Sequence, residues 1–110
     1  MDGLRRGDVV TVTLRGEQGK PRPALVVQAD PFSDLPGVTV LPITSTLIEA
    51  PALRVRVEPA GENGLKKVSQ VMVDKPQTPA RGKVGAVIGR VDRATLAAVD
   101  RALAVFLGLV

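Results

Sequence analysis

The sequence predicts a mainly β protein: five or six short strands forming a compact, strongly bent sheet or small barrel, followed by one helix. Three observations predict this class. Short runs rich in Val, Ile, Leu and Thr recur between residues 9 and 91. The 11 glycines and 9 prolines fall mainly between these runs, at turn positions. The last part of the chain changes to an alanine-rich pattern with helical spacing.

The strands are recognised by their side chains. β-branched residues dominate residues 9–14, and residues 23–29 are nearly continuously apolar, which predicts burial on both faces. Residues 38–43 form a third predicted strand, which is expected to end or bulge at Pro42 because proline cannot donate to a ladder. The remaining predicted strands are residues 53–58, 68–73 and 83–91.

Two of these elements carry further expectations. Residues 53–58 alternate between apolar and charged side chains, so Arg54 and Arg56 are expected to face water. The helix is expected to begin after Asp92, a good N-cap, and to end at Gly108. Its amphipathic face could pack on the sheet or form an interface, and periodicity does not choose between them. Apolar residues recur along this face at Leu96, Val99, Leu103 and Phe106 or Leu107, and Phe106 is expected in the core together with Met72.

Several absences exclude whole classes of chemistry. The chain has no Cys and no His, which excludes thiolate–imidazole zinc sites and nucleophile systems that use histidine. Only 2% of the residues are aromatic, so base stacking on an aromatic platform has almost nothing to work with. No apolar run is long enough to span a membrane, and no apolar stretch follows the charged start. We expect one domain over residues 1–110, located in the cytoplasm, with no cofactor and no metal.

The charge balance points to a polyanion. Lys and Arg number 15 against 11 Asp and Glu, for a net charge of +4, and basic side chains bind phosphates with release of counterions. Residues 73–83 are polar and basic and could line a groove for a charged backbone or form an ordinary solvated loop. The pair Lys66–Lys67 allows the same two interpretations.

Two other stretches could carry chemistry. Arg22 lies between Pro21 and Pro23, which stiffen its backbone, and a rigidly mounted guanidinium matches a phosphate well. The alternative is a solvent-facing turn arginine. Residues 44–46 place three hydroxyls directly after a strand. Hydroxyls there can donate to phosphate oxygens, or they can close a turn by bonding nearby backbone groups.

The order of these motifs resembles the MazF/PemK family of toxin endoribonucleases, over residues 6–109. The resemblance rests on several stretches together rather than on any one of them. They are Arg6-Gly7-Asp8-Val9-Val10, Gly16 to Asp30 with its Arg22-Pro23-Ala24-Leu25-Val26-Val27 run, Leu41-Pro42-Ile43-Thr44-Ser45, Val73-Asp74, Gly89-Arg90-Val91 and the helix segment Val99-Asp100-Arg101-Ala102-Leu103.

This resemblance implies a small SH3-like β-barrel of the CcdB/MazF type with an amphipathic C-terminal helix, assembled as a homodimer. It implies cleavage of single-stranded RNA at short motifs without a metal, by attack of the 2′-hydroxyl to give a 2′,3′-cyclic phosphate and a 5′-hydroxyl. A cognate antitoxin with an acidic, flexible tail would occupy the RNA groove. The catalytic residues fall on Arg22, Thr44 and Glu17, and the expected RNA-binding residues are Lys20, Ser45, Thr46, Lys75 and Gln77.

The chain departs from the family pattern in its first loop, which is short and lacks the usual Ser before Glu17. It also has Lys75-Pro76-Gln77 where the family often has Gln-x-Arg, which puts the RNA motif in doubt. The alternative is a non-catalytic toxin of the same fold that binds a protein target such as gyrase. Those toxins end in an exposed Trp-Gly-Ile, whereas this chain ends Leu107-Gly108-Leu109-Val110 and has no Trp. A third possibility is a degenerate member that only binds RNA or antitoxin.

Overall fold

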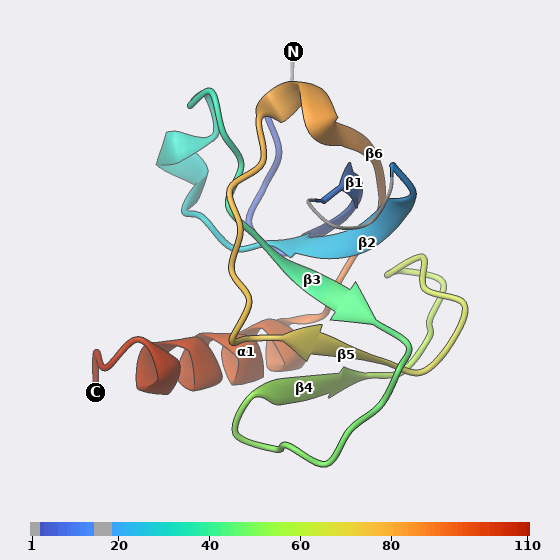
Figure 1. Cartoon of the computed structure of the whole chain (residues 1–110), viewed down its shortest axis with the longest axis vertical. Coiled ribbons are helices and arrows are strands. Elements are labelled where there is room, and N and C mark those ends of the chain that lie inside the picture. Colours follow the sequence, from blue (N-terminus) through green and yellow to red (C-terminus); the bar gives the residue numbers. More distant parts are fainter. Residues whose placement is uncertain (1–2, 15–18) are drawn as a thin grey trace.

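The elements follow the order expected from the sequence. The computed structural model describes residues 3–14 and 19–110, and Figure 1 shows its strands and helix. Two short 3₁₀ helices, Asp30–Phe32 and Arg81–Lys83, were not predicted. The strands are β1 (Asp8–Thr13), β2 (Pro21–Val26), β3 (Val40–Thr44), β4 (Arg54–Val57), β5 (Ser69–Met72) and β6 (Val84–Arg90), and the helix is α1 (Arg93–Phe106).

The described strands form one six-stranded sheet in the order β4-β5-β3-β2-β1-β6. Every neighbouring pair is antiparallel. In Figure 1 β3 runs from the half of the molecule that holds β1, β2 and β6 to the half that holds β4, β5 and α1. The edge strands β4 and β6 do not pair with each other in the described part of the chain. The sheet is therefore strongly bent but open, and the closed SH3-like barrel is not confirmed.

The central strands are buried on both faces, as the apolar run at residues 23–29 predicts. Successive residues point to opposite faces of a strand, so Leu25 belongs to one apolar cluster and its neighbours Ala24 and Val26 to the other. The helix covers the first cluster, where Val99 is fully buried and Leu96, Ala102 and Leu103 pack against it. The second cluster is completed by Leu4 and Val84.

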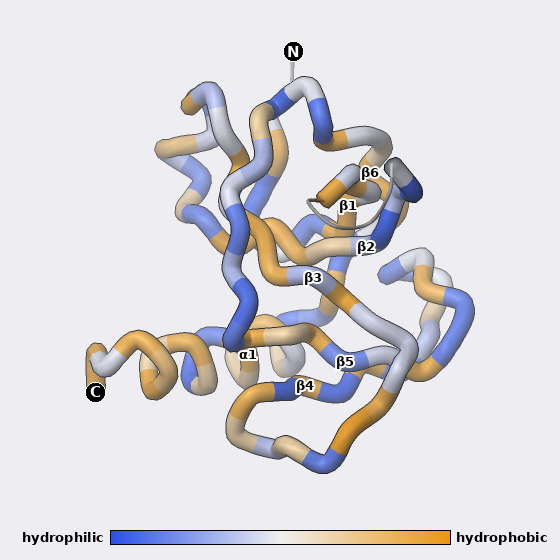
Figure 2. The backbone as a smooth tube through the Cα atoms, viewed as in Figure 1, coloured by the Kyte–Doolittle hydropathy of each residue, from blue (hydrophilic) through white to orange (hydrophobic). Residues whose placement is uncertain are grey.

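The helix has the expected ends. The Asp92 carboxylate accepts a hydrogen bond from the Thr95 N–H at 2.7 Å, and Gly108 follows the last turn with φ of 74°. Its final turn is exposed, however, and Phe106 is 43% exposed, so its expected place in the core is wrong. Figure 2 shows hydrophobic colouring at the end of α1 and at the C-terminus. No helix in the described residues is long and apolar enough to cross a membrane.

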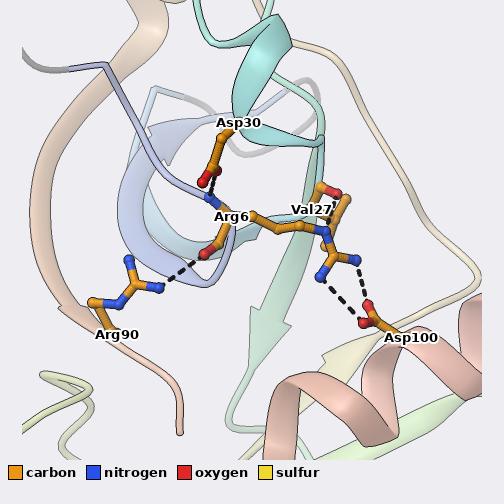
Figure 3. Close-up of polar contacts among 5 residues, drawn as sticks. All are labelled: Arg6, Val27, Asp30, Arg90 and Asp100. Atoms are coloured by element: carbon orange, nitrogen blue, oxygen red, sulfur yellow. Dashed lines mark hydrogen bonds and ion pairs between the residues drawn. The ribbon is translucent and has the colours of Figure 1, made fainter. Parts of the chain in front are cut away.

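The Arg6-Gly7-Asp8 motif ties three distant elements together (Figure 3). The Arg6 guanidinium forms an ion pair with Asp100 of α1 and donates from Nε to the Val27 carbonyl oxygen at 3.1 Å. Its own carbonyl oxygen accepts a hydrogen bond from Arg90 of β6 at 2.9 Å. Asp8 is buried and forms an ion pair with Arg90. This corner fixes α1 and β6 relative to the start of β1.

One expectation about β4 is wrong. Arg56 is largely exposed, as predicted, but the Arg54 side chain is only 9% exposed because it forms an ion pair with Asp74, which follows β5. The alternating pattern marks the two faces of the strand, but it does not reveal a carboxylate 20 residues away that covers one of the arginines.

Candidate functional site

A groove of about 520 Å³ opens beside the sheet where β2 and β3 part. Arg22 and Thr44 both line it. Its other lining residues come from β1, from the strand ends around these two positions, from the loop before β5, and from β5 and β6: Thr11, Leu14, Pro21, Pro23, Pro42, Ile43, Ser45, Thr46, Gly64, Leu65, Lys66, Lys67, Ser69, Met72 and Ile88.

The strand register explains why Arg22 and Thr44 meet. β2 and β3 pair at Val26 with Val40 and at Ala24 with Pro42. Continued two residues further, the same register would place Arg22 opposite Thr44 on one face of the sheet. The ladder ends at Ala24 and Pro42, while β3 pairs along its opposite edge with β5 at Ile43 and Thr44. Arg22 and Thr44 therefore stand on either side of the place where β2 and β3 part, and both line the groove.

Pro23 accounts for the end of the β2–β3 ladder. The Val27 N–H donates to the Thr39 carbonyl oxygen at 3.1 Å, so alternation along β2 turns the backbone nitrogen of residue 23 toward β3. Pro23 has no N–H to donate there. Pro42 lies opposite Ala24 at the last pair. The expectation that β3 ends or bulges at Pro42 is wrong, since the strand continues to Thr44 and pairs with β5 along its opposite edge.

Arg22 is held by the strand on its other side. It is exposed and pairs with Val12, while the flanking prolines pair with Thr13 and Thr11. The arginine therefore lies in a regular strand rather than in a turn. The backbone that carries Arg22 is restricted by two prolines and a ladder, so it loses little further conformational entropy on binding.

The turn after β3 carries three hydroxyls, which were expected either to close a turn or to donate to phosphate oxygens. The Thr44 Oγ1 accepts a hydrogen bond from the Thr46 N–H at 3.0 Å, which closes the turn. Accepting uses a lone pair of the oxygen and leaves the hydroxyl proton able to donate. Thr44 is half-buried, whereas Ser45 and Thr46 are exposed. The turn therefore holds three hydroxyls at the groove.

The charged side chains that line the groove are all basic. Arg22, Lys66 and Lys67 line it, and none of its described lining residues is Asp or Glu. The described part of the chain also contains no group of three His, Cys, Asp or Glu residues that could hold a metal ion. The two lysines were noted in the sequence only as a charged pair. Their place in the groove depends on a long-range contact of their loop that no local pattern reveals.

The remaining predicted site residues lie elsewhere. Glu17 falls outside the described residues, and Lys20 is exposed just before β2 without lining the groove. Lys75 is exposed in the turn after β5, and the Gln77 backbone bonds to Val40, at the start of β3. At about 3.3 Å per residue, Val40 is roughly 13 Å along the strand from Thr44. The structure therefore gathers Arg22, Thr44, Ser45 and Thr46 at the groove, and not Lys75 or Gln77.

Fold and groove together define a small, mainly β protein with a cationic, hydroxyl-lined groove of the kind that suits a polyanion. The family model described as PemK-like, MazF-like toxin of type II toxin–antitoxin systems matches residues 5–107. The chain therefore belongs to this family.

Individual relatives agree with the family match. A protein of Mycolicibacterium smegmatis named as a probable endoribonuclease MazF is 44% identical over 107 residues, covering 96% of this chain and 98% of the relative. The solved structure of the Mycobacterium tuberculosis toxin MazF-mt6 is 28% identical, with a TM-score of 0.79 over 92% of this chain and 96% of that one. A mycobacterial endoribonuclease solved in complex with its cognate antitoxin is 26% identical, with a TM-score of 0.82 over 97% of each chain. The gyrase-binding alternative receives no support from these comparisons.

Proposed function

We propose that this chain is a single-domain toxin that cleaves single-stranded RNA at short sequence motifs, without a metal ion. The observation that carries the proposal is the shared groove of Arg22 and Thr44. The family match and the relative named as a probable endoribonuclease support it. Guanidinium and hydroxyl donors in one cationic groove are suited to the non-bridging oxygens of a phosphodiester.

In the proposed reaction the ribose 2′-oxygen attacks the adjacent phosphorus while the bond from phosphorus to the 5′-oxygen breaks. The products are a 2′,3′-cyclic phosphate and a 5′-hydroxyl. Negative charge grows on the phosphoryl oxygens in the transition state, so preorganised donors lower the barrier. Arg22 supplies a fixed charge and a fork of donors, and Thr44 supplies an O–H from the facing wall. DNA is not a substrate because it lacks the attacking hydroxyl.

The reaction also needs one proton removed from the 2′-hydroxyl and one delivered to the 5′-oxygen. Arginine stays protonated and is a poor base. The resemblance to the family assigns Glu17 to this site, and it is the carboxylate next to Arg22 along the sequence. We propose that Glu17 assists the proton transfers.

We propose Ser45 and Thr46, at the groove, and Lys20, at the start of β2, as RNA contacts near the cleaved bond. Lys75 and Gln77 lie beyond the groove, so we propose them as contacts for flanking nucleotides. The toxin is proposed to act in the cytoplasm as a homodimer and to be blocked by an antitoxin whose acidic tail enters the cationic groove. The relative solved with its cognate antitoxin supports such a partner. We also keep the SH3-like barrel as the proposed description of the fold.

The test is cleavage of a mixed RNA in EDTA by the purified protein, with mapping of the cut ends. We expect cuts that carry cyclic phosphate and 5′-hydroxyl ends, and loss of cutting by Arg22→Ala. Arg93→Ala is the matched control, because it removes an exposed arginine from α1 and leaves the groove intact. Circular dichroism and thermal unfolding establish that each variant folds. Continued cutting by a folded Arg22→Ala protein would contradict the catalytic assignment.

A further inference from the structure

The loop between β4 and β5 forms a wall of the groove that the sequence did not predict. In Figure 1 this loop lies on the same side of the molecule as the start of β2 and the end of β3. Gly64, Leu65, Lys66 and Lys67 all belong to it and line the groove with Arg22. We propose that Lys66 and Lys67 form a second phosphate subsite, which holds the RNA backbone next to the phosphate that is cleaved. The inference rests on the proposed function and assigns a role that the catalytic residues do not cover.

The loop is built as a fixed support. Asn63 is buried, and its Oδ1 accepts hydrogen bonds from the N–H groups of Ala60 at 3.1 Å and Leu65 at 2.9 Å. Its Nδ2 donates to the Glu58 carbonyl oxygen at 2.9 Å. The Asn63 side chain therefore satisfies three backbone groups of the loop. The two lysines follow directly after this anchored turn, so their backbones start from a defined position.

The backbone of the loop also contacts the backbone of β6 closely. Gly64 has a φ of +72°, and a Cβ there would lie 2.2 Å from the Ile88 carbonyl oxygen. At Gly89 a Cβ would lie 2.4 Å from the Glu62 carbonyl oxygen, and the Arg90 N–H donates to that same oxygen at 2.7 Å. Backbone meets backbone at both glycines. These contacts fix the loop against β6, which belongs to the same sheet as β2.

The charges of the two lysines are not used within the described chain. Both are exposed, and neither side-chain ammonium has a hydrogen-bond or ion-pair partner among the described residues. By contrast, four arginines outside the groove form ion pairs with carboxylates: Arg6 with Asp100, Arg54 with Asp74, Arg56 with Glu58 and Arg90 with Asp8. The two adjacent ammonium groups at the groove have no such carboxylate among the described residues.

The chemistry of these groups favours the phosphate backbone. A lysine ammonium acts as a mobile point charge, which binds phosphate without requiring the planar geometry of a guanidinium. It reads no base, so the subsite contributes affinity and positioning rather than sequence choice. The expected signature is a larger KM for RNA with little change in kcat.

The experiment compares the parent protein with the Lys66→Gln, Lys67→Gln double variant. Binding is measured on a short single-stranded RNA whose 2′-hydroxyls are methylated, which prevents cutting, across a range of salt concentrations. Two phosphate contacts predict that the slope of log affinity against log salt falls in magnitude by about 1.4, given about 0.7 per contact on a single strand. On cleavable RNA we expect KM to rise about tenfold and kcat to stay within about twofold.

The matched control is the Arg93→Gln, Arg101→Gln double variant, which removes two exposed charges from α1. We expect its salt slope and KM to stay close to those of the parent. An unchanged slope and KM in the lysine variant would overturn the subsite, and so would a loss of kcat at constant KM, since the lysines would then act in the chemical step. Binding of a poly-glutamate peptide to the parent and to the lysine variant is measured in parallel. If the variant binds only this peptide more weakly, and RNA as well as the parent does, the surface serves an acidic peptide and the RNA assignment is wrong. If the parent binds RNA with the expected slope but never cuts it, the subsite stands and the proposed function fails.

Discussion

Removing the Arg6 side chain should loosen the corner that joins β1, β6 and α1. The Arg6→Ala change keeps both backbone contacts, from the Arg6 N–H to Asp30 at 2.7 Å and from Arg90 to the Arg6 carbonyl oxygen. It removes the ion pair with Asp100 and the hydrogen bond to the Val27 carbonyl oxygen (Figure 3). The change therefore isolates the guanidinium and its methylene stem.

The loss in the free energy of unfolding can be estimated from these contacts. The Asp100 side chain is 45% exposed, so solvent screening limits the ion pair to about 1 kcal/mol. The charge-assisted hydrogen bond to Val27, which is buried, contributes about 1 kcal/mol. Burial of the stem, on a side chain 28% exposed, adds roughly 0.5 kcal/mol. Arg6→Ala should therefore destabilise the protein by about 2.5 kcal/mol.

The assay is thermal unfolding at one fixed protein concentration, since association would shift Tm. An unfolding entropy of about 2.1 cal/mol/K per residue gives about 0.23 kcal/mol/K for this chain, so the expected fall in Tm is about 11 °C. Arg6→Lys keeps the charge but cannot bridge both acceptors, and it should lose about half as much. The control Arg101→Ala, exposed on the same helix, should stay within about 2 °C. An Arg6→Ala protein that melts within about 2 °C of the parent would refute the reasoning.

Three further changes test other parts of the structure. Gly64→Ala should cost more than about 2 kcal/mol in chemical unfolding, because its Cβ would overlap a carbonyl oxygen of β6, whereas Gly108→Ala, at φ +74° with nothing within 4 Å, should cost about 1 kcal/mol. Hydrogen bonds from Thr95, through its side chain first and its backbone N–H second, lower the pKa of Asp92. That stabilisation is present above about pH 4 and is lost as the pH falls through the lowered pKa, so Asp92→Asn should flatten the acid side of a series of Tm measurements against pH. Thr44→Val should lower kcat for RNA cleavage by about 10²–10³-fold, whereas Thr44→Ser should keep most of the activity.

The positions of the elements could be predicted from the sequence because they depend on local patterns. β-branched runs and alternation located the six strands, and Asp92 and Gly108 marked the ends of the helix. Pairing is not local, so the sequence could not give the order of the strands or show that β3 leaves β2 after Pro42 while it pairs with β5 along its other edge. The burial of Arg54 has the same cause, since it depends on Asp74 of another strand's loop.

Only part of the candidate site could be predicted from the sequence, because some of its residues depend on long-range contacts. Arg22 and Thr44 were identified through the family resemblance, and the structure adds that they line one groove. Lys66 and Lys67 had no motif to mark them, because their position depends on the contact of Gly64 with β6. The role of Glu17 stays a prediction, as it lies outside the described residues.

The parting of β2 and β3 links the fold to the proposed chemistry. A regular antiparallel ladder satisfies its own backbone groups and leaves no space between strands for a ligand. Here Pro23 removes the donor that would extend the β2–β3 ladder, and Pro42 occupies its last pair. The strands part at the positions that carry Arg22 and Thr44, which line the same groove. The groups proposed to act on the phosphate are thus placed by rigid strands on both walls, which is the arrangement that electrostatic stabilisation of a transition state requires.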